Sequence, residues 1–190
     1  MHLSLRMLIA FPAAFFLLLV VLLGCTSAKE LTRSSASTLI QKSAKFGAPV
    51  AEAVPRTDFR TFDFTRTGRW DVVDALLTLG YLVEQGNQIT LTAKGEAACK
   101  ESPKDPNPQI VGTFPIAHRE LEKVTGITDS TRPGMKEAKF TWRFSLTALG
   151  KELSSKSPKI GDKYSPGSSH DGTAFFRLYD DGWRLEQVAF

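Results

Sequence analysis

The chain has 190 residues, of which 42% are hydrophobic, so it is long enough for one compact domain or two small ones with an apolar core. Its formal net charge is only +4 and its 24 lysines and arginines are not gathered into one run, which argues against nucleic-acid binding. Three histidines and two cysteines leave few candidates for metal or acid–base chemistry, and we find no CxxC pair, HExxH motif or phosphate-binding glycine loop.

The N-terminal segment has the three parts of a secretory signal. Arg6 supplies the positive region, residues 7–23 form an apolar core, and Gly24 is a small residue before Cys25. The run Leu22-Leu23-Gly24-Cys25 resembles the lipobox of bacterial lipoprotein precursors. The resemblance implies that residues 1–24 are a signal peptide and that Cys25 becomes the lipidated first residue of an exported protein. The residue after Cys25 is Thr26 and not the Asp of the inner-membrane retention signal, which implies the outer membrane, facing the periplasm, in a host with two membranes.

The alternative for this segment is an uncleaved transmembrane anchor. Residues 7–28 are uncharged, and their number is close to the ~20 needed to span a bilayer. Pro12 and the small residues around Cys25 favour cleavage. In both cases the only early charge is positive, so the rest of the chain crosses the membrane. If Cys25 carries lipid, Cys99 has no partner for an intrachain disulfide.

Residues 25–54 are rich in Ser, Thr, Ala and Lys and contain few large apolar side chains. This composition predicts a flexible tether after the lipidated Cys25, with a short helix over residues 37–45 capped by Ser34. The basic excess between residues 29 and 69 is typical of a solvated, mildly basic tether. The alternative is that it has anionic lipid headgroups, lipopolysaccharide or cell-wall polymer as neighbours.

Residues 55–100 hold the clearest helix signal of the chain, followed by a hairpin. An apolar stripe predicts a helix over residues 69–79: Trp70, Val73 and Leu77. Two short strands around a Gly86-Asn87 turn and a helix over residues 93–99 follow. The run from helix to hairpin resembles the last helix and wing of winged-helix domains, which implies a small helix-plus-hairpin packing unit.

Residues 101–109 contain three prolines and predict a linker to a β-rich subdomain over residues 110–190. Two-residue periodicity there predicts an antiparallel sheet of four strands: 111–125, 138–146, 173–179 and 183–190. The alternation shifts phase near Glu120, which predicts an irregularity in the first strand. Residues 149–172 are predicted as a long polar loop. The last strand resembles the closing strand of NTF2-like and cystatin-like domains, in which a helix packs into a curved sheet.

One short pattern occurs twice. Residues 91–95 read Leu-Thr-Ala-Lys-Gly and residues 146–150 read Leu-Thr-Ala-Leu-Gly. Because a helix precedes one copy and a strand precedes the other, we do not infer a repeat from the sequence.

Candidate site residues are few. Aromatic residues of the sheet either line a ligand pocket or form ordinary core: Phe140, Trp142, Phe144, Phe175 and Trp183. His118, Glu120 and Glu122 would share one side of an ideal strand, a pattern typical of a solvated face. Residues 168–171 read Ser-Ser-His-Asp, but adjacent residues cannot form a triad, whose members converge from separate segments. We therefore predict no catalytic, metal or cofactor site.

Together these patterns predict an α+β lipoprotein that is not an enzyme. Its periplasmic part would be a structural or protein-interaction module, attached to the membrane through Cys25 and in contact with envelope proteins, lipid or cell-wall polymer, but not nucleic acid. The alternative is a binding module that holds a small apolar ligand or an envelope lipid in the C-terminal sheet.

Overall fold

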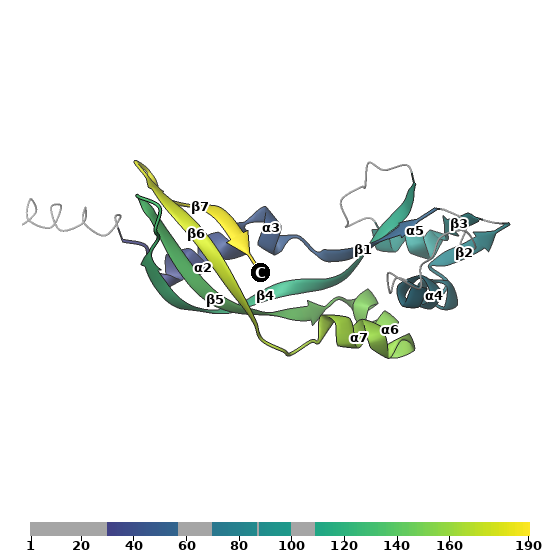
Figure 1. The fold of residues 1–190 in the computed structure, drawn as a ribbon. Coiled ribbons are helices and arrows are strands. Elements are labelled where there is room, and N and C mark those ends of the chain that lie inside the picture. The colour runs from purple at the N-terminus through teal and green to yellow at the C-terminus, as the bar shows by residue number, and fades with distance from the viewer. Residues whose placement is uncertain (1–29, 57–69, 87, 100–108) are drawn as a thin grey trace, which may run out of the picture.

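The computed structural model describes residues 30–56, 70–86, 88–99 and 109–190, which form an α+β fold (Figure 1). Six helices lie in this part of the chain: α2 (Arg33–Lys42), α3 (Ala44–Gly47), α4 (Trp70–Thr78), α5 (Ala93–Cys99), α6 (Ala148–Lys156) and α7 (Pro158–Tyr164). The strands are β1 (Val50–Pro55), β2 (Leu82–Gln85), β3 (Gln88–Leu91), β4 (Ile110–Asp129), β5 (Met135–Leu146), β6 (His170–Tyr179) and β7 (Gly182–Ala189). No helix of these residues is both long and apolar enough to cross a membrane.

The main sheet is curled and antiparallel, with the strand order β1-β4-β5-β6-β7. The four predicted strands are confirmed as β4 to β7, but the sheet has five strands because β1 pairs with the first half of β4. The predicted irregularity is also confirmed, since the β4–β5 register shifts between Leu121 and Lys123 and again between Val124 and Gly126. Such shifts bend a strand, and they let β4, which is 20 residues long, serve both ends of an elongated molecule.

The prediction of a flexible tether is wrong for residues 30–54, which fold against the sheet. Helix α2 lies along the concave side and contacts β4 and β7. Thr32 caps it through the Ser35 backbone N–H, so the helix begins earlier than predicted. Ala36 and Ile40, one turn apart, are fully buried, and Phe46 of α3 joins them. A few well-spaced apolar residues are enough here, because the curled sheet surrounds them.

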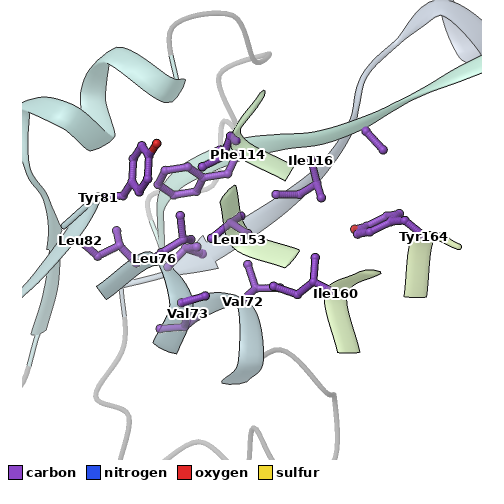
Figure 2. Packing of buried hydrophobic residues seen from close by; sticks show 14 of the residues in the cluster. Val72, Val73, Leu76, Tyr81, Leu82, Phe114, Ile116, Leu153, Ile160 and Tyr164 are labelled. Carbon is purple, nitrogen blue, oxygen red and sulfur yellow. The ribbon is translucent and has the colours of Figure 1, made fainter. Parts of the chain in front are cut away.

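A second core lies at the other end of the molecule, between α4, the β2–β3 hairpin, β4 and the helices α6 and α7 (Figure 2). The predicted helix over residues 69–79, the hairpin and the helix over residues 93–99 are confirmed as α4, β2–β3 and α5. The prediction of a loop over residues 149–172 is wrong for α6 and α7. Their buried side chains face α4 and β4: Leu149, Leu153, Ile160 and Tyr164. The helix-plus-hairpin part is therefore completed from the C-terminal half of the chain.

The predicted linker over residues 101–109 lies outside the described residues except for Gln109, as do the signal peptide and Cys25. Gln109 accepts a hydrogen bond from the Arg56 backbone N–H at 2.6 Å, at the end of the β1–β4 pairing. The boundary predicted at residue 54 falls inside β1, which runs from Val50 to Pro55 and pairs with β4, with register shifts after Val50 and after Val54.

The two Leu-Thr-Ala-x-Gly segments form the same strand-to-helix junction. In the first, the Thr92 backbone N–H donates to the Tyr81 carbonyl at 3.1 Å, and the Gly95 backbone N–H donates to the Thr92 hydroxyl at 3.1 Å. In the second, the Thr147 backbone N–H donates to the Ile116 carbonyl at 2.9 Å, and the Gly150 backbone N–H donates to the Thr147 hydroxyl at 2.9 Å. Each threonine therefore caps the helix that follows it.

Candidate functional site

The concave side of the sheet carries an aromatic cluster centred on Trp142. Trp142 lies opposite His170 in the β5–β6 register, and their rings stack with centroids 4.7 Å apart. Phe144 contacts the Trp142 ring edge-on at 4.8 Å, and the Phe190 ring lies 5.5 Å from it. We call these four residues with Arg119 the Trp142 cluster.

Arg119 is the charged member of the Trp142 cluster. Its guanidinium lies 4.4 Å from the Phe190 ring centroid and donates long hydrogen bonds, of 3.3 and 3.4 Å, to the carbonyls of Lys45 and Ala48. Its Nε is buried without a hydrogen-bond partner, and no carboxylate of a described residue forms an ion pair with it. Burial lowers the pKa of this guanidinium below its usual range. A half-buried cation with an unused donor is suited to hold an anionic group.

An open cleft of about 390 Å³ lies beside Arg119, between the α2–α3 segment and β4. It is lined by Gln41, Phe46, Gly47, Arg119, Glu120 and Leu121. Its walls combine an aromatic ring, aliphatic carbon and one cation. Glu120 does not neutralise Arg119, because its carboxylate accepts from Arg143 Nε at 3.1 Å. The cleft thus offers both an apolar wall and a positive charge.

The predicted pocket residues separate into three environments. Phe140 and Trp142 are 1% and 5% exposed in the core, where the Phe140 ring meets Phe46 edge-on at 6.0 Å. Phe144 and Trp183 are half-buried at its margin. Phe175 points to the opposite face of the sheet, because its neighbours in β6, Ala174 and Phe176, are the buried ones. The interior of the predicted pocket is filled by α2 and Phe46.

The Ser-Ser-His-Asp sequence does not converge into a triad. The Ser169 hydroxyl donates to Glu122 at 2.5 Å, while the His170 ring stacks on Trp142. Asp171 is exposed on the other side of β6, and its carbonyl accepts from Trp142 Nε1 at 3.3 Å. His170 Nε2 is buried without a partner, which adds a second unused nitrogen to the Trp142 cluster.

Glu120 and Glu122, two of the three residues predicted to share a strand face, are engaged in local bonds. Hydrogen bonds from Ser145 and Arg143 lower the pKa of Glu120, and the bond from Ser169 lowers the pKa of Glu122. Across the described ranges, no three His, Cys, Asp or Glu residues are close enough to hold a metal ion.

Two groups, each of a tyrosine, a carboxylate and a lysine, connect the elements that surround the second core. The Tyr81 hydroxyl donates to Glu152 at 2.5 Å, and Lys94 Nζ donates to the same carboxylate at 3.2 Å. Burial and the carboxylate raise the pKa of Tyr81.

The second group joins α7 to β1. The Tyr164 hydroxyl donates to Glu52 at 2.6 Å, and Lys163 forms an ion pair with the same carboxylate. Burial raises the pKa of Tyr164 strongly. The partners are 71 and 112 residues apart in the two groups, so no local sequence pattern reveals them.

Cys99 is half-buried at the end of α5, and burial raises the pKa of its thiol. Its Sγ lies close to Gly112, where an added methyl group would meet it at 2.7 Å. A raised pKa leaves less thiolate and therefore a less reactive cysteine.

Sequence reasoning missed Arg119, Phe46 and Phe190 as members of this region. The signal for Arg119 was its place in the alternation of β4, opposite Phe144, which puts a cation on the apolar side of the sheet. Comparisons of the chain with protein-family models, with curated proteins and with solved structures find no match.

Proposed function

We propose that the protein is a bacterial lipoprotein, anchored through Cys25 in the outer membrane, whose periplasmic part is a non-catalytic interaction module. The observation that carries the proposal is the Leu22-Leu23-Gly24-Cys25 motif at the end of an apolar run. A non-catalytic role is consistent with the local bonds of Glu120, Glu122 and Ser169, which hold these side chains to neighbouring residues of the fold.

We also propose that the two ends of the molecule have different roles. The helix-plus-hairpin end, with its winged-helix-like run, would carry the protein-binding surface. The curled-sheet end, with α2 against its concave side, would be the part next to the anchor. Among the described residues of this end, Val83 of β2 is 39% exposed and offers apolar surface to a partner.

Fatty-acid labelling in a bacterial host tests the anchor. Cells expressing the wild type, Cys25→Ala or Cys99→Ala grow with an alkyne-bearing fatty acid, and the protein is then isolated and its label measured. We expect label on the wild type and on Cys99→Ala but not on Cys25→Ala, and wild-type protein in the outer-membrane fraction of a density gradient. Label that persists in Cys25→Ala would refute the proposal.

A second candidate function is the binding of an envelope lipid, and Arg119 is the observation that favours it. The cleft beside Arg119 would receive the anionic headgroup at the guanidinium, with an acyl chain along Phe46 and Leu121. An anionic lipid fits this cleft better than a purely apolar ligand, because an apolar ligand would leave the Arg119 guanidinium without a negative partner.

Mass spectrometry of lipids extracted from the purified protein tests this candidate. We expect a stoichiometric anionic lipid on the wild type, on a soluble form without residues 1–25, and on Arg132→Gln, an exposed position between β4 and β5 away from the cleft lining. We expect Arg119→Gln to lose that lipid. Equal lipid content in Arg119→Gln and Arg132→Gln would exclude the site.

A further inference from the structure

The described part of the fold begins only a few residues after Cys25 in the chain. Only five residues, 26–30, separate Cys25 from Leu31. Leu31 is 4% exposed and belongs to the core formed by α2 and the sheet, so its position in the fold is fixed. A fully extended chain gains at most about 3.6 Å per residue, so Cys25 lies within about 20 Å of Leu31 in any conformation.

Leu31 lies at one end of the elongated molecule. Helix α2 starts at the end where the β4–β5 and β6–β7 hairpins turn, and α4, α5 and the β2–β3 hairpin lie at the other (Figure 1). Strand β4 connects the two ends, and its 20 residues correspond to about 60 Å at the usual rise of a strand. An anchor at Cys25 therefore holds the end with the β4–β5 and β6–β7 turns near the bilayer. The helix-plus-hairpin end, with α4, α5 and the β2–β3 hairpin, touches the bilayer only if the molecule lies flat.

The β6–β7 turn carries side chains suited to the headgroup layer. Among the described residues four large hydrophobic side chains are exposed, and two of them, Leu178 and Tyr179, are adjacent at this turn and each 39% exposed. Trp183 lies opposite Leu178 in the hairpin register. Tyrosine and tryptophan favour the membrane interface, where the ring meets acyl carbon and the polar atom stays hydrated.

The charges at the turn limit how deeply it enters. Asp181 pairs with Arg184 at 2.6 Å, and the Tyr179 hydroxyl donates to Glu186 at 2.8 Å. Asp180 is exposed beside them. Because acids and bases are mixed, the turn gains little from anionic lipid, and because carboxylates are present it stays out of the hydrocarbon.

On the basis of the proposed function, we propose that the β6–β7 turn rests in the headgroup layer of the membrane that holds the Cys25 lipid. Leu178 and Tyr179 make the contact. The curled sheet then stands on the bilayer, and the α4–β2–β3–α5 end points into the aqueous compartment. The partner recognised by the turn is a lipid surface of any net charge.

Depth-dependent quenching tests the orientation. The lipidated full-length protein, in a Cys99→Ser background, is reconstituted into phosphatidylethanolamine–phosphatidylglycerol vesicles that contain a headgroup-labelled quencher. A fluorophore is placed at the turn by Asp180→Cys or at the far end by Glu84→Cys, both at exposed positions. We expect several-fold stronger quenching at position 180 than at position 84, with little change when phosphatidylglycerol is varied.

The control variant is Leu178→Ser with Tyr179→Ser, which should weaken quenching at position 180 while the urea unfolding midpoint stays near that of the parent. Equal quenching at both positions would show a molecule lying flat and overturn the inference, as would stronger quenching at position 84. Vesicle flotation separates this from failure of the anchor: protein that floats with the wrong quenching pattern refutes only the orientation, whereas protein that does not float refutes both.

Discussion

The two Leu-Thr-Ala-x-Gly junctions have nearly identical geometry in very different surroundings. In each, the threonine hydroxyl donates to two successive carbonyls, those of Gly80 and Tyr81 at 2.7 and 3.2 Å in the first junction. In the second junction the carbonyls are those of Pro115 and Ile116, at 2.8 and 3.1 Å. The leucine of each copy pairs with the residue that follows the second carbonyl, Leu82 or Ala117.

The surroundings differ in size and burial. The first junction follows strands of four residues and starts α5, which buries only Gly95 completely. The second junction follows β5, of 12 residues, and is hydrogen-bonded to β4, of 20 residues. It starts α6, in which Leu149, Gly150 and Leu153 are buried. The same five-residue pattern therefore gives the same local geometry at both junctions. The length and packing of the adjoining strands and helices determine how much of the protein's stability depends on each junction.

Gly150→Ala should have the largest effect. A methyl group at Gly150 would lie 2.0 Å from the Ile116 carbonyl oxygen, which also accepts from Thr147, so α6 must move away from β4. We expect a loss of about 3 kcal/mol in the free energy of unfolding, measured by urea denaturation. The control is Gly161→Ala in α7, where the nearest atom is Ser154 Cβ at 3.7 Å. Similar effects of the two variants would contradict the close approach.

Gly95→Ala should cost less, although its methyl group would also lie 2.0 Å from a carbonyl oxygen, that of Tyr81. The short β2–β3 hairpin can shift with α5. We therefore expect a loss of about 1.5 kcal/mol in the free energy of unfolding, measured in the same urea experiment. A larger loss for Gly95→Ala than for Gly150→Ala would reverse the comparison and make the first junction the more rigid one.

Removal of the capping hydroxyl should have a similar but smaller effect at each junction. Thr147→Val and Thr92→Val keep the branched shape and lose the hydrogen bonds to the glycine N–H and to the carbonyls. We expect about 1 kcal/mol for each in urea denaturation, which is typical of a lost helix cap. The loss should be slightly larger for Thr147, because its bonds to the carbonyls are both half-buried. No loss at either position would mean that water replaces the cap.

Glu152→Gln should give the smallest effect, and one that depends on pH. Glu152 of α6 links the junctions by accepting hydrogen bonds from Tyr81 and Lys94, which lower its pKa. A pKa that is lower in the folded state adds stability above the ordinary glutamate value of about 4.3, and this stability is lost as the pH falls through the folded value.

The melting temperatures of the wild type and Glu152→Gln should therefore differ at neutral pH and converge in acid. The matched control is Glu84→Gln, at an exposed site on β2 away from this contact, for which we expect no such convergence. A difference that is constant with pH would show that the carboxylate charge plays no part.

Elements with strong local periodicity could be predicted from the sequence. The alternation from Ala138 to Leu146 predicted a strand that the structure confirms as β5. The apolar stripe of residues 69–79 predicted a helix that the structure confirms as α4. The helices α2, α6 and α7 were missed or underestimated because each has only a few apolar residues among many polar ones. Their burial depends on strands that are distant in the chain, and no local pattern records that partner.

The candidate site was predicted only in part. Aromatic residues on the sheet were expected at a pocket, and Trp142 does lie at the centre of a cluster with unused polar atoms. Phe175 was placed on the wrong face, since two adjacent phenylalanines in a strand point to opposite sides and the sequence does not say which side is covered. Arg119 was missed because its significance comes from Phe190 and Lys45, 71 and 74 residues away.

The sequence by itself determined the local features: the lipobox-like motif at Cys25, the helix-plus-hairpin run, the alternating strands and the turns between them. These depend on neighbouring residues, so they can be read along the chain. Only the tertiary structure decided that residues 30–54 belong to the fold, that α6 and α7 complete the second core, and that Arg119 has no acidic partner among the described residues. The physical reason is that burial is a property of the assembled sheet and helices, and it fixes which few apolar residues are covered and which charges are left without a partner.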